Sequence, residues 1–312
     1  MGGNHVRVTR RLRNVDIPLV VDVDAHRAQR VAAEIGAEWE TSSSVLAGEV
    51  DTAVIAVPTH LHRHVGVPLA EAGIHILVEK PLAGTLEDAQ ALVDAARAND
   101  VVLMVGHVER FNTAILELDR WLDDVIHVEA TRVGPFSGRV EEGVIFDLMI
   151  HDLDIVRQII PSPISEVQAV RQNPASNTED LACALFRFEN GATANITASR
   201  IGQNKVRRLE ITQGSSTISV DLLRQDVMIR RMAQARFFAS PDPTYQQSGV
   251  VEIPFLANRG EPLLLEVEHF FDCIAQTRRP MVGGEDGLEA VRWALRVADA
   301  SGEAVAPRRR VG

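Results

Sequence analysis

The sequence predicts an α/β protein: a doubly wound parallel sheet, followed by an α+β domain with a mostly antiparallel, open sheet. Two observations carry this prediction. Residues 1–110 alternate short apolar runs with amphipathic segments, which is typical of parallel strands covered by helices. After an apolar helical segment near 143–160 the pattern changes to closely spaced runs that favour antiparallel strands. We therefore divide the 312-residue chain into a first domain over 1–110 and a second over 111–312.

Each element of the first domain follows from a local pattern. Short apolar runs bounded by polar or turn residues indicate strands, and longer segments with one apolar face indicate helices. The expected strands are Leu19–Val23, Thr52–Val57, His75–Val78 and Val101–Val105. The expected helices are Ala25–Ile35, Leu61–Ala72 and Leu86–Ala98.

The second domain begins with the helix near 143–160 and continues as strands. Asn190-Gly191 is the strongest hairpin signal in the chain, because this dipeptide suits a tight two-residue turn. The expected strands are Ile164–Arg171, Leu181–Glu189, Ala192–Arg200, Arg207–Gln213 and Thr217–Leu223. Residues 232–258 contain Pro241 and Pro243 and little periodicity, so we expect a long excursion from the sheet there. Leu263–Ala275 and Gly287–Ala300 are expected to be closing helices.

Composition and charge narrow the class of protein. No apolar run is long enough to span a membrane and no signal-peptide pattern opens the chain, so we expect a soluble, cytoplasmic protein without a membrane partner. Cys183 and Cys273 lie in apolar surroundings, which favours buried free thiols over a disulfide. The formal net charge of −11 argues against a nucleic-acid partner.

The first candidate functional group is Lys80, in the segment Val78-Glu79-Lys80-Pro81. It follows an expected strand, and ligands bind at the carboxyl edge of open parallel sheets. An ammonium group held there by a proline turn can polarise an oxygen atom of a substrate. The alternative is a solvated Glu–Lys pair before a turn proline.

The second candidate group is Asp147 with His151, on the expected helix near 143–160. Residues four apart on an α-helix share a face, so the two side chains can meet. A carboxylate that orients an imidazole is a common way to build a general base. The alternative is an Asp–His pair with a structural role. We expect Asp152 and Asp154 to be solvated or to cap a helix.

Asp22 lies at the end of the expected strand that begins at Leu19. A carboxylate in this place can accept hydrogen bonds from both hydroxyls of an adenosine ribose and would repel a 2′-phosphate. Asp22 therefore predicts NAD as the cofactor, with NADP less favoured. The alternative is a helix cap, a role that Asp24 fills more naturally.

The segment His60-Leu61-His62-Arg63-His64 raises the question of a metal site. Zinc needs ligands that converge tetrahedrally, whereas alternate histidines at the start of a helix point in different directions. No cysteine lies nearby in the sequence. We therefore predict no metal site.

The order of these motifs resembles the Gfo/Idh/MocA family of nicotinamide-dependent sugar and polyol dehydrogenases. The resemblance rests on V-E-K-P at 78–81, G-H-V-E-R-F-N at 106–112 and D-x-x-x-H-D-x-D at 147–154. It continues through E-D-L-A at 179–182 and E-V-E-H-F at 266–270, and covers essentially the whole chain from residue 2 onward. The combination is specific to the family, although no single piece is.

This resemblance implies hydride transfer between nicotinamide and a secondary alcohol. Lys80, Asp147 and His151 are the implied catalytic residues: His151 as general base, Asp147 orienting its ring and Lys80 stabilising the reacting oxygen. The implied cofactor-binding residues are Gly2, Asp22, Pro58, Thr59, His62, Glu79 and Lys80. The family also commonly forms homo-oligomers, so we expect a homodimer or a homotetramer.

The G-H-V-E-R-F-N and R-V-G-P-F segments resemble the branch that includes UDP-N-acetylglucosamine 3-dehydrogenases. Arg132 and Arg139 flank an expected loop, and arginine forks suit a diphosphate, although both could equally be surface charge. With His107 and Asn112 they are the expected substrate contacts. Thr113 stands where this branch usually has proline, which weakens the match.

A nucleotide sugar is therefore the predicted substrate, and a free sugar or inositol is the alternative. A different class also stays open, because the same two-domain body can serve as a ligand-sensing regulator or a pseudoenzyme. The complete set of Lys80, Asp147 and His151 opposes that alternative.

The start of the chain departs from the family's pattern. Residues 1–7 resemble the part of the family's G-x-G-x-x-G fingerprint that follows its first two glycines, so Gly2 corresponds to the third. We therefore expect the first strand to be lacking, with a gap between the strands containing Val20 and Val54. A start assigned too late, a shortened form and a degraded relative each explain this, and we favour the first. If residues 1–312 are the whole product, we expect weak nicotinamide binding and poor stability.

Overall fold

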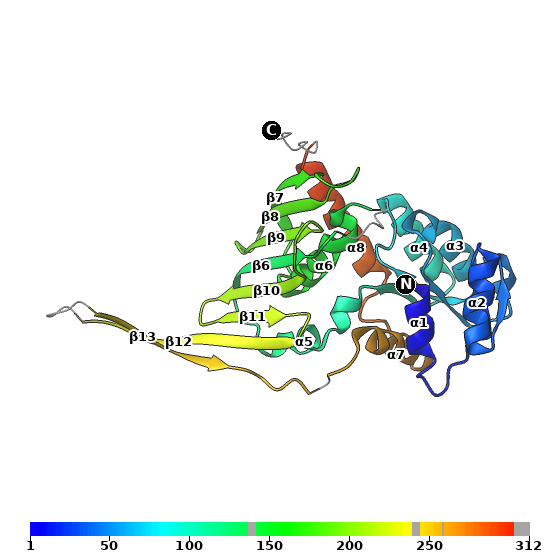
Figure 1. The fold of residues 1–312 in the computed structure, drawn as a ribbon, viewed down its shortest axis with the longest axis horizontal. Coiled ribbons are helices and arrows are strands. Elements are labelled where there is room, and N and C mark those ends of the chain that lie inside the picture. The colour runs from blue at the N-terminus through cyan, green and yellow to red at the C-terminus, as the bar shows by residue number, and fades with distance from the viewer. Residues whose placement is uncertain (137–141, 239–243, 258, 303–312) are drawn as a thin grey trace. The chain divides into compact units, whose positions relative to one another are not determined.

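The computed structural model describes residues 1–136, 142–238, 244–257 and 259–302 (Figure 1). The chain divides into two compact units. Unit 1 comprises residues 1–111 and 260–292, and unit 2 comprises residues 112–259 and the chain from 293 onward. The division by function, with its boundary at residue 110, stays a prediction.

Unit 1 contains the parallel strands, arranged in two sheets. Strand β1 (Leu19–Val21) pairs with β2 (Glu38–Glu40). In the second sheet β4 (His75–Glu79) lies between β3 (Thr52–Ile55) and β5 (Leu103–Gly106). All of these pairs are parallel, which confirms the predicted doubly wound fold. Strand β2 was not predicted, because Glu38-Trp39-Glu40 is short and has no apolar run.

The helices of unit 1 connect and cover these strands. They are α1 (Gly2–Thr9), α2 (Ala25–Ile35), α3 (His62–Glu71), α4 (Leu86–Ala98), α7 (Pro262–Ala275) and the first part of α8 (Gly284–Ala300). Helices α2 and α4 have the predicted bounds, so these two predictions are confirmed. A side chain caps the N-terminal end of each helix. Asp24 accepts a hydrogen bond from the Arg27 N–H at 3.1 Å, and Thr85 accepts one from the Asp88 N–H at 3.1 Å.

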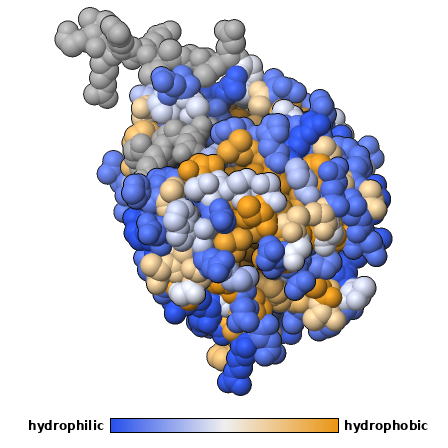
Figure 2. Space-filling model, turned by 90° about the vertical axis from the view of Figure 1, so that its right-hand side faces the viewer, coloured by the Kyte–Doolittle hydropathy of each residue, from blue (hydrophilic) through white to orange (hydrophobic). Residues whose placement is uncertain are grey.

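The predicted gap in the sheet is confirmed. Among the described residues β1 pairs with β2 alone, and β3 pairs with β4 alone. No described strand therefore pairs with the remaining edge of β1 or with the remaining edge of β3. Burial agrees: residues 76–79 of β4 are buried, whereas all of β1 and residues 52–54 of β3 are only half-buried. In Figure 2, a view from the side of Figure 1 on which α1 and α2 lie, hydrophobic side chains are visible among hydrophilic ones.

Unit 2 is built on a sheet of eight strands in the order β13-β12-β11-β10-β6-β9-β8-β7. The strands are β6 (Val125–Val133), β7 (Ile164–Gln172), β8 (Leu181–Phe188), β9 (Thr193–Ser199), β10 (Val206–Gln213), β11 (Thr217–Asp221), β12 (Asp226–Phe238) and β13 (Thr244–Glu252). Among the described residues, β6–β9 is the one parallel pair of this sheet, so the predicted mostly antiparallel sheet is confirmed. Asn190-Gly191 forms the predicted turn between β8 and β9, with a φ of 88° at Gly191.

The expected excursion from the sheet over 232–258 takes the form of two paired strands, since β12 pairs with β11 only over residues 226–230 and continues beyond them paired with β13. Strands β12 and β13 form a long antiparallel hairpin, in which Ile229 pairs with Glu252 and Phe238 pairs with Thr244 (Figure 1). Main-chain hydrogen bonds between two strands do not require an apolar alternation, so the sequence pattern gave no signal. Strand β6 was also missed, although its buried Val128 and Ala130 alternate with more exposed residues.

Unit 2 also contains α5 (Thr113–Leu116), a short 3-10 helix (Leu118–Arg120), a π-helix over Ile145–Met149, and α6 (Ile150–Ile159), which continues the π-helix. The last part of α8 also belongs to this unit. Its Trp293 stacks on Phe186, with ring centroids 5.9 Å apart, and packs at a tilt against Phe188, with centroids 5.8 Å apart. In the part of the chain that the structure describes, no helix has the length and apolar character needed to cross a membrane.

Candidate active site

Lys80 follows the end of β4, in unit 1. The Lys80–Pro81 peptide bond is cis, and the main-chain N–H of Lys80 donates to Oε2 of Glu79 at 3.2 Å. The Glu79 side chain is buried, and its Oε1 lies 2.6 Å from Nε2 of His5 on α1. A solvated Glu–Lys pair, the alternative for this motif, is therefore wrong.

A second buried acid lies next to Glu79. Glu266 on α7 is fully buried, and neither of its carboxyl oxygens has a hydrogen-bond partner among the described residues. Burial, and then the negative charge of Glu79, raises the pKa of Glu266 well above its ordinary value. Helices α1 and α7 pack through Val8, Leu263 and Val267. His5 and Glu266 belong to motifs that carry the family resemblance, but nothing local in the sequence indicates their contact with β4.

His62 connects the turns that follow β3 and β4. Its ring is 1% exposed, and Nδ1 lies 3.0 Å from the Pro81 carbonyl oxygen and 3.2 Å from that of Leu82. Its Nε2 lies 3.0 Å from the Val57 carbonyl oxygen. His62 thus links the main chain just before Pro58-Thr59 to the main chain just after Lys80, while its contact with a cofactor stays a prediction. Across the described ranges, no group of three or more His, Cys, Asp or Glu residues could hold a metal ion.

Asp22 follows β1 and is partly engaged. Oδ1 accepts a hydrogen bond from the Asp24 N–H at 2.9 Å, and Oδ2 lies 3.4 Å from Nη1 of Arg27. Asp24 takes the capping role on α2, as expected, so Asp22 is not needed for it. Asp22 is therefore a carboxylate at the end of a strand, next to an arginine. Its contact with an adenosine ribose stays a prediction.

The helix that carries Asp147 and His151 differs from the one expected. Asp147 lies in the π-helix and His151 lies in α6, and both side chains are half-buried. The hydrogen bonds of a π-helix run from i to i+5, so the spacing of four does not place these residues as it would on an α-helix. Their mutual contact stays a prediction. Single π turns occur frequently at functional sites.

Two expectations near this helix were wrong. Asp152 and Asp154 are each 1% exposed rather than solvated. Asp152 forms a bidentate ion pair with Arg132, with Nε–Oδ2 and Nη2–Oδ1 distances of 2.8 and 2.9 Å. Arg132 lies in β6 instead of a loop, and its guanidinium group fixes α6 to the sheet. Asp154 lies 3.6 Å from Arg157.

The other expected substrate residues are distributed over both units. His107, in unit 1, is buried. Asn112, in unit 2, is buried and caps α5 by accepting the Ala114 N–H at 3.1 Å, while its amide donates to the Leu222 carbonyl at 2.9 Å. Arg139 lies outside the described residues. Contacts of all four residues with a substrate stay predictions.

Two family models match the chain. One, described as the oxidoreductase family with an NAD-binding Rossmann fold, matches residues 1–107. The other, described as the GFO/IDH/MocA C-terminal domain, matches residues 87–216. Together they cover the parallel strands and the first part of the second unit.

Known proteins agree with these matches. UDP-N-acetylglucosamine 3-dehydrogenase of Acidithiobacillus ferrooxidans is 32% identical over 89% of this chain and 87% of its own length. Its solved structure covers 96% of this chain and 93% of its own, with a TM-score of 0.86. The scyllo-inositol 2-dehydrogenase (NAD(+)) of Bacillus subtilis is 28% identical over 82% of the chain and 78% of its own length. A levoglucosan dehydrogenase solved with NADH and levoglucosan shares the fold, with 21% identity, a TM-score of 0.79, and coverage of 96% of this chain and 92% of its own.

Proposed function

The chain belongs to the Gfo/Idh/MocA family of NAD-binding oxidoreductases, and from this premise we propose that it oxidises a secondary alcohol of a nucleotide sugar. The observation that carries the proposal is the 32% identity, over 89% of the chain, to a UDP-N-acetylglucosamine 3-dehydrogenase. The placement of Lys80 supports it, because the lysine follows a strand at the carboxyl edge of a parallel sheet.

The residues of unit 1 fit a nicotinamide dinucleotide. Asp22 offers carboxylate oxygens for ribose hydroxyls, and α1 begins at Gly2 with main-chain N–H groups that suit a pyrophosphate. A Cβ atom at Gly2 would lie 3.9 Å from Cβ of Ala56, so this helix start lies close to the end of β3. Pro58, Thr59 and Lys80 follow β3 and β4, where we propose the nicotinamide binds. When bound, NAD supplies the hydride acceptor.

We propose that Lys80, Asp147 and His151 divide the work of oxidation. His151 takes the proton of the substrate hydroxyl as general base, and Asp147 orients its ring. The Lys80 ammonium stabilises the negative charge that develops on the oxygen. As the carbonyl forms, the C–H bond breaks and its electron pair leaves with the hydrogen, so the substrate loses one proton and one hydride.

We consider two substrate classes, nucleotide sugars and inositols. The relatives support a nucleotide sugar, namely UDP-N-acetylglucosamine at its 3-position, or an inositol as the alternative. Arg132 does not favour the first, because its guanidinium group is already bound to Asp152. A diphosphate would therefore depend on other cationic groups.

We further propose a cytoplasmic homodimer or homotetramer. Val170 on β7 and Leu185 on β8 are 61% and 48% exposed, and they lie on the open side of the unit 2 sheet. Exposed apolar side chains on a sheet face are often covered by another subunit.

A substrate panel tests the proposal. The chain would be incubated with NAD and, separately, UDP-N-acetylglucosamine, scyllo-inositol, myo-inositol and free N-acetylglucosamine, and NADH formation would be followed. We expect the highest kcat/KM with the nucleotide sugar. Preference for an inositol would select the alternative substrate. Binding of NADH without turnover of any compound would favour the ligand-sensing or pseudoenzyme alternative.

A further inference from the structure

We propose that Glu179 is a positioning residue that fixes the start of the helix carrying Asp147 and His151. The sequence motifs alone assign Glu179 no role in the reaction. The inference rests on the dehydrogenation proposed above, since it concerns the helix of the proposed general base.

Glu179 contacts the beginning of this helix through both its main chain and its side chain. Its carbonyl oxygen accepts the Val144 N–H at 3.0 Å, and its Oε1 accepts the Ile145 N–H at 3.3 Å. Ile145 is the first residue of the π-helix. The first N–H groups of a helix have no partner within it, and a carboxylate there also interacts favourably with the helix dipole. Glu179 therefore supplies an anchor at the turn that precedes Asp147.

Gly143 makes room for this carboxylate. A Cβ atom at position 143 would lie 1.8 Å from Oε1 and 2.3 Å from Oε2 of Glu179, far inside contact distance. The φ angle of Gly143 is not in the left-handed region, so its backbone would accept alanine. The Gly143 carbonyl also accepts the Asp147 N–H at 2.9 Å. The absence of a side chain at Gly143 thus serves the Glu179 contact and not the conformation of the turn.

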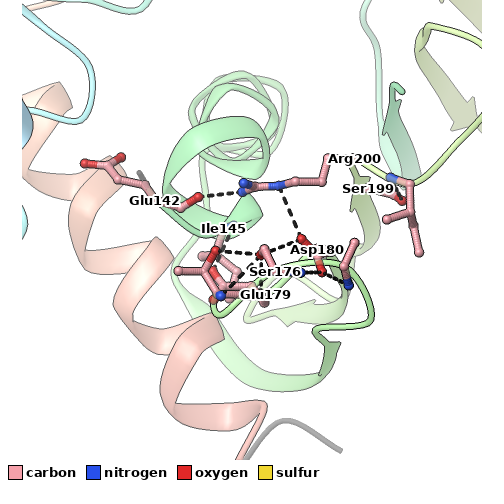
Figure 3. A network of polar contacts seen from close by, with 10 residues as sticks. Glu142, Ile145, Ser176, Glu179, Asp180, Ser199 and Arg200 are labelled. Atoms are coloured by element: carbon pink, nitrogen blue, oxygen red, sulfur yellow. Dashed lines mark hydrogen bonds and ion pairs between the residues drawn. The ribbon is translucent and has the colours of Figure 1, made fainter. Parts of the chain in front are cut away.

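A buried ionic network holds Glu179 in place (Figure 3). The neighbouring Asp180 is fully buried, and its Oδ2 accepts the N–H groups of Ala175 and Ser176 at 2.7 and 2.9 Å. Its Oδ1 accepts the Ser176 hydroxyl at 2.7 Å and lies 4.0 Å from Nε of Arg200. The turn that contains Glu179 is therefore fixed by the residue next to it.

Arg200 connects this turn to the segment before the helix. Its Nη2 donates to the Glu142 carbonyl at 2.6 Å, and its main-chain N–H donates to the Asp180 carbonyl at 2.9 Å (Figure 3). Residues 142–145 are thus held by Arg200 on one side and by Glu179 on the other. A displacement of about 1 Å in a positioned group can reduce turnover about 100-fold, so this restraint has a catalytic consequence.

A double-mutant cycle tests the inference. Glu179→Ala removes the side-chain anchor, and Gly143→Ala displaces the same carboxylate by steric contact. We expect each to lower kcat about 10- to 100-fold with KM and NADH affinity nearly unchanged. The double variant should be no slower than the worse single variant, because both act on one contact. Glu179→Gln keeps an acceptor for the Ile145 N–H and should restore most of kcat.

Matched controls are available in the same unit. Gly214→Ala adds a Cβ that meets no atom within 4 Å, and Glu189→Gln changes an exposed side chain. Both should leave kcat unchanged. Multiplicative losses in the double variant, or full activity in Glu179→Ala, would overturn the proposal.

Amide hydrogen exchange gives a readout without turnover. Exchange at Ile145 should accelerate in Glu179→Ala and Gly143→Ala and stay slow in the two controls. If exchange at Ile145 accelerates in the two variants but the wild-type chain oxidises no sugar, the anchor stands and the proposed function is removed. Unchanged exchange in both variants would reject the anchor, whatever the activity. If Glu179→Ala does not fold, Gly143→Ala and Glu179→Gln answer the same question.

Discussion

The two units each bury a carboxyl group near a proposed catalytic element, and they treat its charge in opposite ways. In unit 2, burial raises the pKa of Asp180, but hydrogen bonds from Ser176 and Ala175 and the charge of Arg200 lower it more, so that pKa lies below its ordinary value. In unit 1, Glu266 has no such donors among the described residues, and burial raises its pKa. Burial alone therefore does not decide the charge of a carboxyl group; the donors around it do.

The two proposed catalytic groups, His151 and Lys80, therefore lie in different electrostatic surroundings. The helix of His151 begins beside the network of Asp180, Ser176 and Arg200, in which hydrogen bonds and the charge of Arg200 lower the pKa of Asp180. Lys80 instead follows Glu79, whose carboxylate is bound to His5 and lies close enough to Glu266 to raise its pKa. The surroundings of Asp180 thus favour its charged form, whereas the surroundings of Glu266 favour its protonated form.

The largest expected effect comes from removing the proposed catalytic group of either unit. Lys80→Met and His151→Asn should each lower kcat about 1,000-fold, the range of charge stabilisation and general-base catalysis. NADH affinity, measured by calorimetry, should change little. Lys205→Met and His26→Asn, at exposed positions, are the controls. Loss of NADH affinity in place of turnover would assign these residues to cofactor binding.

The next effect is on stability and separates the two carboxyl groups directly. Asp180→Asn places an amide N–H group against donors that now face a carboxylate, and removes the partner of Arg200. We expect it to lower the free energy of unfolding by about 3 kcal/mol, measured by urea denaturation. Glu266→Gln should not be destabilising, because glutamine resembles the protonated acid. An equal decrease in the free energy of unfolding in both variants would contradict the difference between Asp180 and Glu266.

A smaller effect is expected at Asp22, where the charge balance is shared with Arg27. Asp22→Ser removes the carboxylate that repels a 2′-phosphate and releases Arg27 to bind one. Affinity for NADPH should rise about tenfold relative to NADH, roughly 1.4 kcal/mol. The double variant Asp22→Ser with Arg27→Ala should lose this gain, and if it does not, Arg27 has no part in cofactor choice.

The smallest effect is the pH dependence of Glu266. Its pKa is raised in the folded chain, so its contribution to stability is present below the unfolded pKa of about 4.3 and is lost as pH rises toward the folded value. Asp180 has the opposite sign, and its contribution is lost as pH falls through its lowered pKa. Glu266→Gln should therefore raise Tm more at alkaline than at acidic pH. A gain that does not vary with pH would contradict this.

Local patterns predicted much of the fold. Helices α2 and α4 were predicted with the correct bounds, and Asp24 and Thr85 cap their N-terminal ends. Asn190-Gly191 likewise marks the β8–β9 turn. The β12–β13 hairpin was missed because main-chain pairing leaves no apolar period in the sequence. Lys80 was recognised as a strand-end group from four adjacent residues.

The contacts around the proposed catalytic residues could not be predicted in the same way. The His5–Glu79 contact joins residues 74 positions apart, and the Ile145–Glu179 contact joins residues 34 positions apart. Arg132 was expected in a loop because the glycine and proline after it suggested a turn, whereas it is the penultimate residue of β6. Such contacts depend on how helices and strands pack against one another, and local sequence patterns do not predict that packing.

The measurement that tests the central claim most directly is hydride transfer itself. UDP-N-acetylglucosamine carrying deuterium at C3 would be incubated with NAD and the chain, and the NADH formed would be analysed by mass spectrometry. We predict deuterated NADH from the wild-type chain, and none from a His151→Asn variant that still binds NADH. Unlabelled NADH, or no NADH from a chain that binds the cofactor, would contradict oxidation at this position.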